Sequence, residues 1–98
     1  MPLITTSGTA QEIFPKNTSR VSFTIKNEDN TNSVYVKKER AEKNDVSNTN
    51  HDHIIGPGGS LSLNAMLDGK QTIQERWTCV AGAGTPVIAW FETEDIQR

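Results

Sequence analysis

The sequence predicts a small all-β domain, an antiparallel β-sandwich or flattened barrel of five to seven strands. From residue 20 to residue 27 (Arg-Val-Ser-Phe-Thr-Ile-Lys-Asn) apolar and polar side chains alternate, a period of two that is typical of a half-buried strand. The alternation recurs along the chain, with turn-forming residues between the segments that carry it. A chain of 98 residues has room for one domain of this kind, so we expect a single core.

Each break between the alternating segments contains residues that bend the backbone. The breaks are a Pro-Lys-Asn-Thr-Ser run, an Asn-rich run, a Gly-Pro-Gly-Gly run, an Asp-Gly pair and a Gly-Ala-Gly-Thr run. The pair Asp68-Gly69 predicts a hairpin between two strands. In chain order, the predicted strands cover residues 9–14, 20–27, 33–38, 60–67, 73–80 and 86–92.

Domain organisation follows from changes in composition. Residues 1–8 are small and polar and predict a loose N-terminal arm, and residues 9–94 form the single β domain. Within it, residues 38–53 are rich in charged, Asn and Thr side chains that cannot bury themselves, so we expect an exposed polar loop, in which residues 39–43 could form one helical turn. Residues 95–98 are expected to be a short C-terminal tail.

Charge and targeting signals narrow the classes of partner. A net charge of −2 and a pI near 5.6 argue against binding to nucleic acid or to an anionic membrane, both of which need a surplus of Lys and Arg. The N-terminus has neither a basic region nor an apolar run typical of a signal peptide, so we expect a protein made in the cytoplasm. The low hydrophobic fraction of 34% predicts a thin sandwich that is completed by a homo-oligomer.

One predicted strand raises a question about buried charge. In the segment 73–80, Ile73, Glu75, Trp77 and Cys79 would share a face. Cys79 is the only cysteine, and we interpret it as a small buried hydrophobe rather than a reactive thiol. A carboxylate on an inward face needs a partner such as an arginine, or a position at an edge or a subunit interface.

The sequence contains no arrangement that predicts catalysis. His51-Asp52-His53 is the nearest approach to a metal site, but a usable site needs at least a third ligand, and none can be assigned. No nucleophile can be matched to a base. We therefore expect a protein that is not an enzyme, with no catalytic, cofactor-binding or metal-binding residues. A metal-dependent enzyme that uses His51 and His53 is the competing hypothesis.

Short motifs follow one another in order over nearly the whole chain. They are Gly8-Thr9-Ala10-Gln11-Glu12-Ile13-Phe14-Pro15-Lys16-Asn17, a strand opened by Arg20 and closed by Asn27, Val34-Tyr35-Val36, Ile55-Gly56-Pro57-Gly58-Gly59-Ser60, and a strand ending in Glu92. This order resembles the small accessory virion proteins of tailed bacteriophages. The resemblance implies a β-sandwich component of the virion. The polar loop of residues 38–53 departs from it, because such proteins usually have a shorter link there.

Two binding functions therefore compete. The resemblance implies a structural protein that decorates and cements the capsid by binding the major capsid protein or another virion protein. The alternative is a tail- or fibre-associated adhesion module that recognises a carbohydrate or protein on the host surface, because exposed aromatic residues on strands can stack on sugars. The residues expected at an interface are Thr5, Thr6, Tyr35, Trp77 and Trp90.

Overall fold

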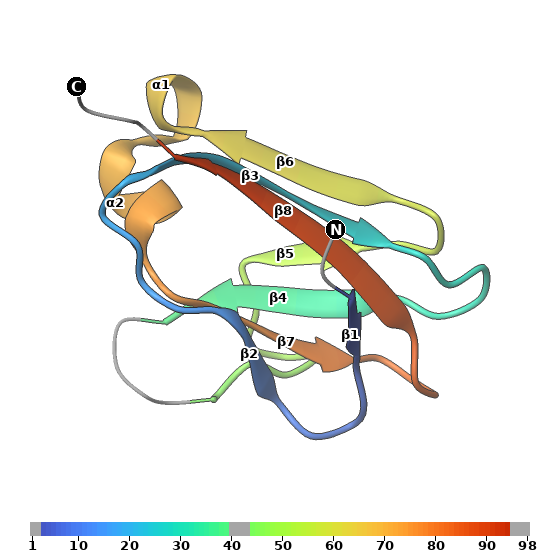
Figure 1. Cartoon of the computed structure of the whole chain (residues 1–98). Coiled ribbons are helices and arrows are strands. Elements are labelled where there is room, and N and C mark those ends of the chain that lie inside the picture. Colours follow the sequence, from blue (N-terminus) through green and yellow to red (C-terminus); the bar gives the residue numbers. More distant parts are fainter. Residues whose placement is uncertain (1–2, 40–43, 95–98) are drawn as a thin grey trace.

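The computed structural model describes residues 3–39 and 44–94 of the chain, and these residues form a two-layer β-sandwich with two short helices. One sheet has the strand order β1-β8-β3-β6, and the other has the order β2-β7-β4-β5 (Figure 1). The elements are β1 (Leu3–Thr5), β2 (Gln11–Phe14), β3 (Arg20–Asn27), β4 (Val34–Lys38), β5 (His53–Ile55), β6 (Ser60–Asn64), α1 (Ala65–Asp68), α2 (Lys70–Gln74), β7 (Trp77–Ala81) and β8 (Val87–Glu94).

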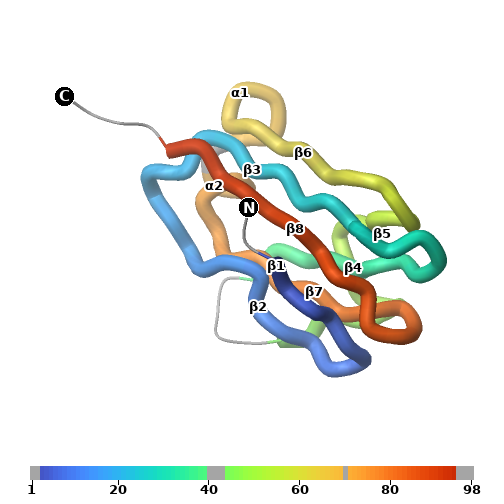
Figure 2. The backbone as a smooth tube through the Cα atoms, turned by 45° about the vertical axis from the view of Figure 1, so that its right-hand side comes forward, coloured from blue at the N-terminus to red at the C-terminus, as the bar shows by residue number. Residues whose placement is uncertain are grey.

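The strand pairing gives a jelly roll. The first four strands pair antiparallel with the last four in reverse order, as β1 with β8, β2 with β7, β3 with β6 and β4 with β5. Successive pairs alternate between the two sheets, as in a long hairpin that has been rolled up. In the views of Figures 1 and 2, β6, β3 and β8 run side by side in one layer, and β4 and β7 belong to the other.

The core fills the space between the sheets and contains a chain of aromatic rings. The ring of Phe14 lies 5.0 Å from that of Phe23 and 5.1 Å from that of Trp90, and Phe23 lies 5.2 Å from Trp77. Aromatic pairs at these separations stabilise a core beyond the area that they bury. Aliphatic side chains and Cys79 complete the cluster; they are Ile13, Ile25, Val34, Val36, Ile55, Leu63, Ile73 and Ile88.

The predicted fold class is confirmed, and most of the predicted strands are present. β3 has the predicted bounds, and Val34 and Val36 of β4 point inward while Tyr35 is half-buried on the other face. The described residues contain eight strands, which is more than predicted. The reason is that β1 and β5 have three residues each, too few for an alternation to be recognised.

The segment between β6 and β7 was predicted wrongly. The strands predicted over residues 60–67 and 73–80 are interrupted by α1 and α2, so Asp68-Gly69 joins two helices rather than two strands. The side chain of Asn64 accepts a hydrogen bond from the Leu67 N–H at 3.0 Å and so begins α1 as its N-cap. Gly69 has φ of 89°, a conformation that favours glycine.

The N-terminal segment is part of the sandwich instead of the loose arm that the sequence predicted. Leu3–Thr5 form β1 and pair with β8 in the register Leu3 to Ala89 and Thr5 to Val87. Thr6, which follows, donates to the Pro86 carbonyl from its backbone N–H at 2.9 Å and from its hydroxyl at 2.6 Å. This pairing gives β8 a partner along an edge that would otherwise be open.

A buried arginine holds one end of the sandwich together. Arg20, at the start of β3, is fully buried and lies 4.2 Å from the centre of the Phe14 ring. Its Nε donates to Oε2 of Glu92 at 2.5 Å. Its remaining nitrogens donate to three backbone carbonyls at 2.7 to 3.0 Å, those of Pro15, Ile73 and Glu75. One side chain thus connects the turn after β2, the end of α2, β3 and β8.

A buried asparagine has the same role at the other end. The Nδ2 of Asn27 donates to the carbonyls of Asn32 at 2.7 Å and of Ile55 and Gly56 at 3.2 Å. Its Oδ1 accepts from the Asp29 N–H at 3.0 Å. The turn after β3 and the turn before β6 are therefore tied to each other through a single amide.

The polar loop predicted for residues 38–53 overlaps both neighbouring strands. Lys38 belongs to β4 and His53 to β5, and a short bridge joins Ser47 and Asn50 between them. The helical turn predicted near residues 39–43 falls mostly on residues 40–43, which lie outside the described residues, as does the predicted tail of residues 95–98.

Candidate functional site: the surfaces of the sandwich

The residues predicted to form an interface do not come together in one place. Thr6 and Trp77 are buried within the chain, where the Trp77 indole N–H donates to the Thr72 carbonyl at 3.0 Å. Trp90 is half-buried against the core, while Thr5 is exposed on β1 and Tyr35 lies on the outer face of the other sheet. Because β7 is buried along its whole length, Trp77 is a core residue and offers no surface for a sugar to stack on.

The outer face of the β1-β8-β3-β6 sheet exposes two large apolar side chains. Leu3 on β1 is 66% exposed and Phe91 on β8 is 44% exposed. Leu3 lies opposite Ala89, two residues before Phe91 on β8, so both side chains point to the same face. Most of the side chains around them are small and polar, among them Thr24, which lies opposite Phe91, and the charged Lys26 lies on the same face, opposite Ala89. We call this surface, formed by Leu3, Thr5, Ser22, Thr24, Ser62, Phe91 and Thr93, the outer Thr/Ser face.

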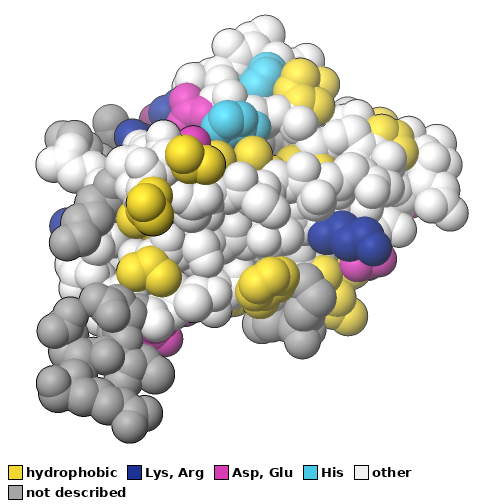
Figure 3. Space-filling model, turned by 90° about the horizontal axis from the view of Figure 1, so that it is seen from above, with side chains coloured by type: hydrophobic (Ala, Val, Ile, Leu, Met, Phe, Trp, Pro, Cys, Tyr) yellow, Lys and Arg dark blue, Asp and Glu magenta, His cyan; other side chains and the backbone are white. Residues whose placement is uncertain are grey.

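A second apolar group lies at the end of β6. Met66 and Leu67 of α1 are 96% and 83% exposed, and together with Val21 and Ala65 they line a shallow groove of about 600 Å³. Figure 3, which shows the molecule from above, shows the hydrophobic side chains in separate groups rather than in one continuous patch. The sequence did not reveal this feature, because a strand had been predicted through residues 60–67. The Asn-x-x-Leu-Asp pattern at residues 64–68 is a helix-capping signal that could have predicted α1.

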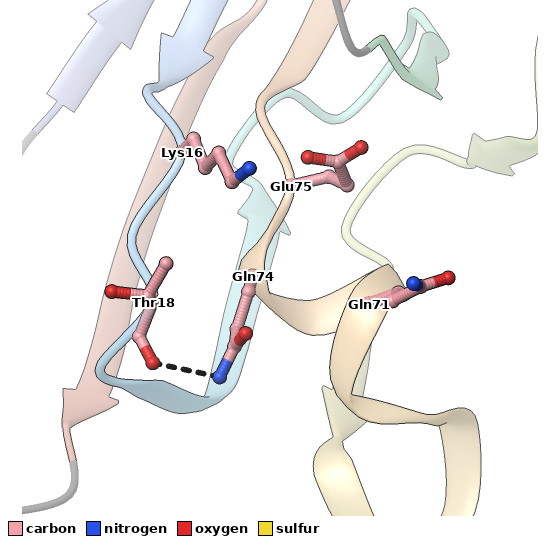
Figure 4. A pocket seen from close by; sticks show the side chains of 5 residues that line it. All are labelled: Lys16, Thr18, Gln71, Gln74 and Glu75. Carbon is pink, nitrogen blue, oxygen red and sulfur yellow. Dashed lines mark hydrogen bonds between the residues drawn. The ribbon is translucent and has the colours of Figure 1, made fainter.

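A polar hollow of about 430 Å³ lies between the turn after β2 and the end of α2. Its walls are rigid, because the Asn17 N–H donates to the Gln74 carbonyl at 2.9 Å and the Gln74 side chain donates to the Thr18 carbonyl at 2.7 Å (Figure 4). Arg20 donates to backbone carbonyls of both segments, those of Pro15, Ile73 and Glu75. The lining offers an ammonium group, a carboxylate, two amides and a hydroxyl; it consists of Lys16, Thr18, Gln71, Gln74 and Glu75.

Glu75 does not lie on an inward strand face as predicted, because the chain leaves α2 at this residue and β7 begins two residues later. Its backbone carbonyl accepts from Arg20 at 3.0 Å. Arg76 donates from Nε to Oε1 of Glu12 at 2.6 Å, and its Nη1 lies 3.9 Å from Oε2 of the buried Glu39. These contacts join β2 to the residues just after β4 and just before β7.

The two histidines have different neighbours. The His51 ring lies 4.8 Å from the Tyr35 ring and its Nδ1 is 3.1 Å from the Ser47 carbonyl, whereas the His53 ring lies 6.0 Å from Trp77. Asp52 accepts a hydrogen bond from the Lys38 N–H at 2.9 Å. Within residues 3–39 and 44–94, no three potential metal ligands come together.

The burial of Cys79 has a chemical consequence. Desolvation raises the pKa of its thiol from 9.0 to about 12, against a smaller opposing effect of a hydrogen bond with Gln11. A thiol is nucleophilic only as the thiolate, so Cys79 is inert near neutral pH. The interpretation of this residue as a small buried hydrophobe is confirmed.

No protein-family model, no curated protein and no solved structure matches this chain. Neither helix among the described residues approaches the length needed to cross a bilayer, since α1 and α2 have four and five residues.

Proposed function

We propose that this chain is a non-enzymatic structural protein of a phage particle, which binds the capsid through its outer Thr/Ser face and stabilises the shell. The observation that carries the proposal is the exposure of Leu3 and Phe91 on a sheet face whose other side chains are mostly small, with Lys26 as a charged exception. Exposed apolar side chains with a polar surround are typical of protein interaction sites. The jelly roll supports the proposal at the level of fold alone, because capsid and lectin domains both use it.

The mechanism is binding of many copies to equivalent sites. A ligand that binds only the assembled shell stabilises it by RT ln(1 + [L]/Kd) per site, which is about 2.7 kcal/mol at a hundredfold excess over Kd. A rigid β-sandwich adds little ordering cost to this, because its strands are already fixed before binding. The protein partner would be the major capsid protein or another virion protein.

The test is co-sedimentation with shells that lack the chain. We expect the wild-type protein to saturate the shells at a fixed ratio and Phe91→Thr to bind at least about tenfold more weakly, a loss of about 1.4 kcal/mol. Ile54→Thr is the matched control, because Ile54 is 56% exposed on a strand of the other sheet. Wild-type protein that does not bind the shells would contradict the proposal. If Phe91→Thr binds as tightly as the wild type, the outer Thr/Ser face is not the surface that binds the capsid.

The alternative function is a tail- or fibre-associated adhesion module that recognises a host-surface carbohydrate or protein. The polar hollow favours it, because its rigid walls and its amides, hydroxyl and two charges are the kinds of group that hydrogen-bond to sugars. Titration of the isotope-labelled protein with neutral, amino and acidic monosaccharides distinguishes the two functions. Shifts of the NMR amide signals of Thr18 and Gln74 on addition of a sugar would support the adhesion function. If these signals do not shift, the result favours the structural function.

A further inference from the structure

The direction of the backbone groups on β6 follows from the register of its ladder with β3. The Asn27 N–H donates to the Gly59 carbonyl at 2.9 Å, which makes these two residues a hydrogen-bonded pair just beyond the end of the ladder. Hydrogen-bonded and non-hydrogen-bonded pairs alternate, so Leu61 and Leu63 turn their N–H and C=O groups toward β3. Three residues of β6 turn these groups to the opposite, outer edge: Ser60, Ser62 and Asn64.

Two side-chain contacts agree with this assignment. The hydroxyls of Thr24 and Ser62 lie 2.9 Å apart, as expected for a non-hydrogen-bonded pair, in which side chains approach more closely. The N–H of Asn64 donates to Oδ2 of Asp68 at 3.0 Å, so the chain itself caps this group. The N–H and C=O groups of Ser60 and Ser62 remain at the outer edge.

This edge has none of the usual protections. Among the described residues, no strand pairs with β6 on the side away from β3, and β6 forms the upper border of the sheet in Figure 1. β6 has five residues, whereas the other edge strands β1, β2 and β5 have three, four and three. Its sequence, Ser-Leu-Ser-Leu-Asn, contains no charge and no proline, and its ladder with β3 has no bulge. An unprotected edge of this kind is a template for another strand.

We propose that the outer edge of β6 pairs with β6 of a second copy of this chain. An antiparallel arrangement with a two-fold axis at Leu61 places Ser60 of one copy opposite Ser62 of the other. Each of these two pairs exchanges two backbone hydrogen bonds, so four bonds use the outward N–H and C=O groups of Ser60 and Ser62 in both copies. An axis at Ser62 would instead require the Asn64 N–H, which Asp68 already occupies.

The charged side chains near the outer edge of β6 allow a second copy of this chain to bind there. The nearest charged side chain on the strand beside the edge is Lys26, which lies opposite Ser60 on β3. In the dimer the two Lys26 residues are three strand spacings apart, about 14 Å at 4.8 Å per spacing. That distance exceeds the Debye length of about 8 Å at physiological ionic strength, so their repulsion is screened. The same register brings the exposed Met66 and Leu67 alongside the partner's turn at Gly56–Gly59, where apolar area can be buried.

The dimer would also strengthen the proposed binding to a shell. A two-fold axis perpendicular to the sheet joins the two β1-β8-β3-β6 sheets into one of eight strands, with both outer Thr/Ser faces on the same side. Two faces on one rigid body bind a repeating surface with a higher apparent affinity than one face alone. This last step rests on the proposed function, whereas the dimer itself does not.

The test uses the purified wild-type protein without particles. We expect light scattering to show a mass that rises from 10.8 kDa toward twice that value as concentration increases. In the same range, hydrogen exchange of the Ser60 and Ser62 amides should slow with concentration, while the Leu61 and Leu63 amides stay protected throughout.

Two substitutions of Ser62 distinguish the contribution of its backbone N–H to the dimer from that of its side chain. Ser62→Pro removes the outward N–H without removing a bond to β3, so we expect a folded protein whose dimer dissociates at least about tenfold more readily. Ser62→Ala keeps the N–H and is the matched control that should dimerise like the wild type. A monomer at every concentration would overturn the proposal, as would a dimer whose Ser60 and Ser62 amides exchange freely. Because the assay contains no shells, its failure is distinct from a failure of capsid binding.

Discussion

Replacing Arg20 with alanine should destabilise the domain more than any substitution of a surface charge. The substitution removes the charged partner of the Glu92 carboxylate and leaves the carbonyls of Pro15, Ile73 and Glu75 without the guanidinium donor. Loss of one member of a buried ion pair costs about 3–5 kcal/mol. Because the Glu92 side chain is 23% exposed, water can solvate part of it, so we expect a loss of about 4 kcal/mol for all four contacts together.

The loss is large against the stability of a domain of this size, which is about 5–15 kcal/mol. It should lower the melting temperature by roughly 15–30 °C, at about 4–8 °C per kcal/mol for a small domain. Glu92→Gln keeps an oxygen that accepts from the guanidinium, so its cost should be only about 1 kcal/mol.

Urea unfolding followed by tryptophan fluorescence measures these differences. Lys26→Ala is the matched control, because the Lys26 side chain is 50% exposed and lies 3.9 Å from Glu28, so its cost should stay below about 0.5 kcal/mol. An Arg20→Ala variant that loses less than about 1 kcal/mol would refute the role of Arg20 as the connection between the four elements.

Two further predictions concern a thiol and a glycine. Burial raises the pKa of the Cys79 thiol to about 12, so as the pH rises this thiol ionises in the unfolded chain before it ionises in the folded one. Its contribution to the free energy of unfolding is therefore fully present below about pH 9 and is lost as the pH rises toward 12. Comparing urea unfolding of the wild type and Cys79→Ala at pH 7.5 and about 10.5 isolates this effect, and an equal pH dependence in both would contradict it. Gly84 has φ of 64°, and an added Cβ would lie 2.8 Å from Nδ2 of Asn32. Gly84→Ala should therefore lower the free energy of unfolding by about 1–2 kcal/mol, whereas Gly8→Ala, with open space around it and no positive φ, should change it by less than about 0.5 kcal/mol.

The alternation of apolar and polar side chains predicted much of the sandwich, because a half-buried strand requires this pattern within its own few residues. β3 shows this most clearly, since Phe23 and Ile25 point into the core and Lys26 points out. The same rule failed between residues 65 and 74, where the short helices α1 and α2 carry spacings that alternation also fits. The strand order depends on contacts between residues far apart in the sequence, such as those of β1 and β8, which are 82 to 86 positions apart, and no local pattern predicts such contacts.

The surfaces were harder to predict than the fold. Trp77 and Thr6 were expected at an interface, yet both are buried by segments distant in the sequence. Phe91 reaches the surface because Trp90 and Glu92, on either side of it in β8, point inward. The role of Arg20 depends on the carbonyls of Ile73 and Glu75 and on the carboxylate of Glu92, all more than 50 residues away, so no local pattern could predict it.

The amount of this chain in purified phage particles decides whether it is a structural component of them. Washed particles would be analysed by quantitative mass spectrometry, with the chain measured against the major capsid protein. We expect a fixed, reproducible ratio that survives washing at moderate salt, since a protein bound at equivalent sites must follow the copy number of those sites. A chain that is abundant in the lysate but absent from washed particles would contradict the proposed function.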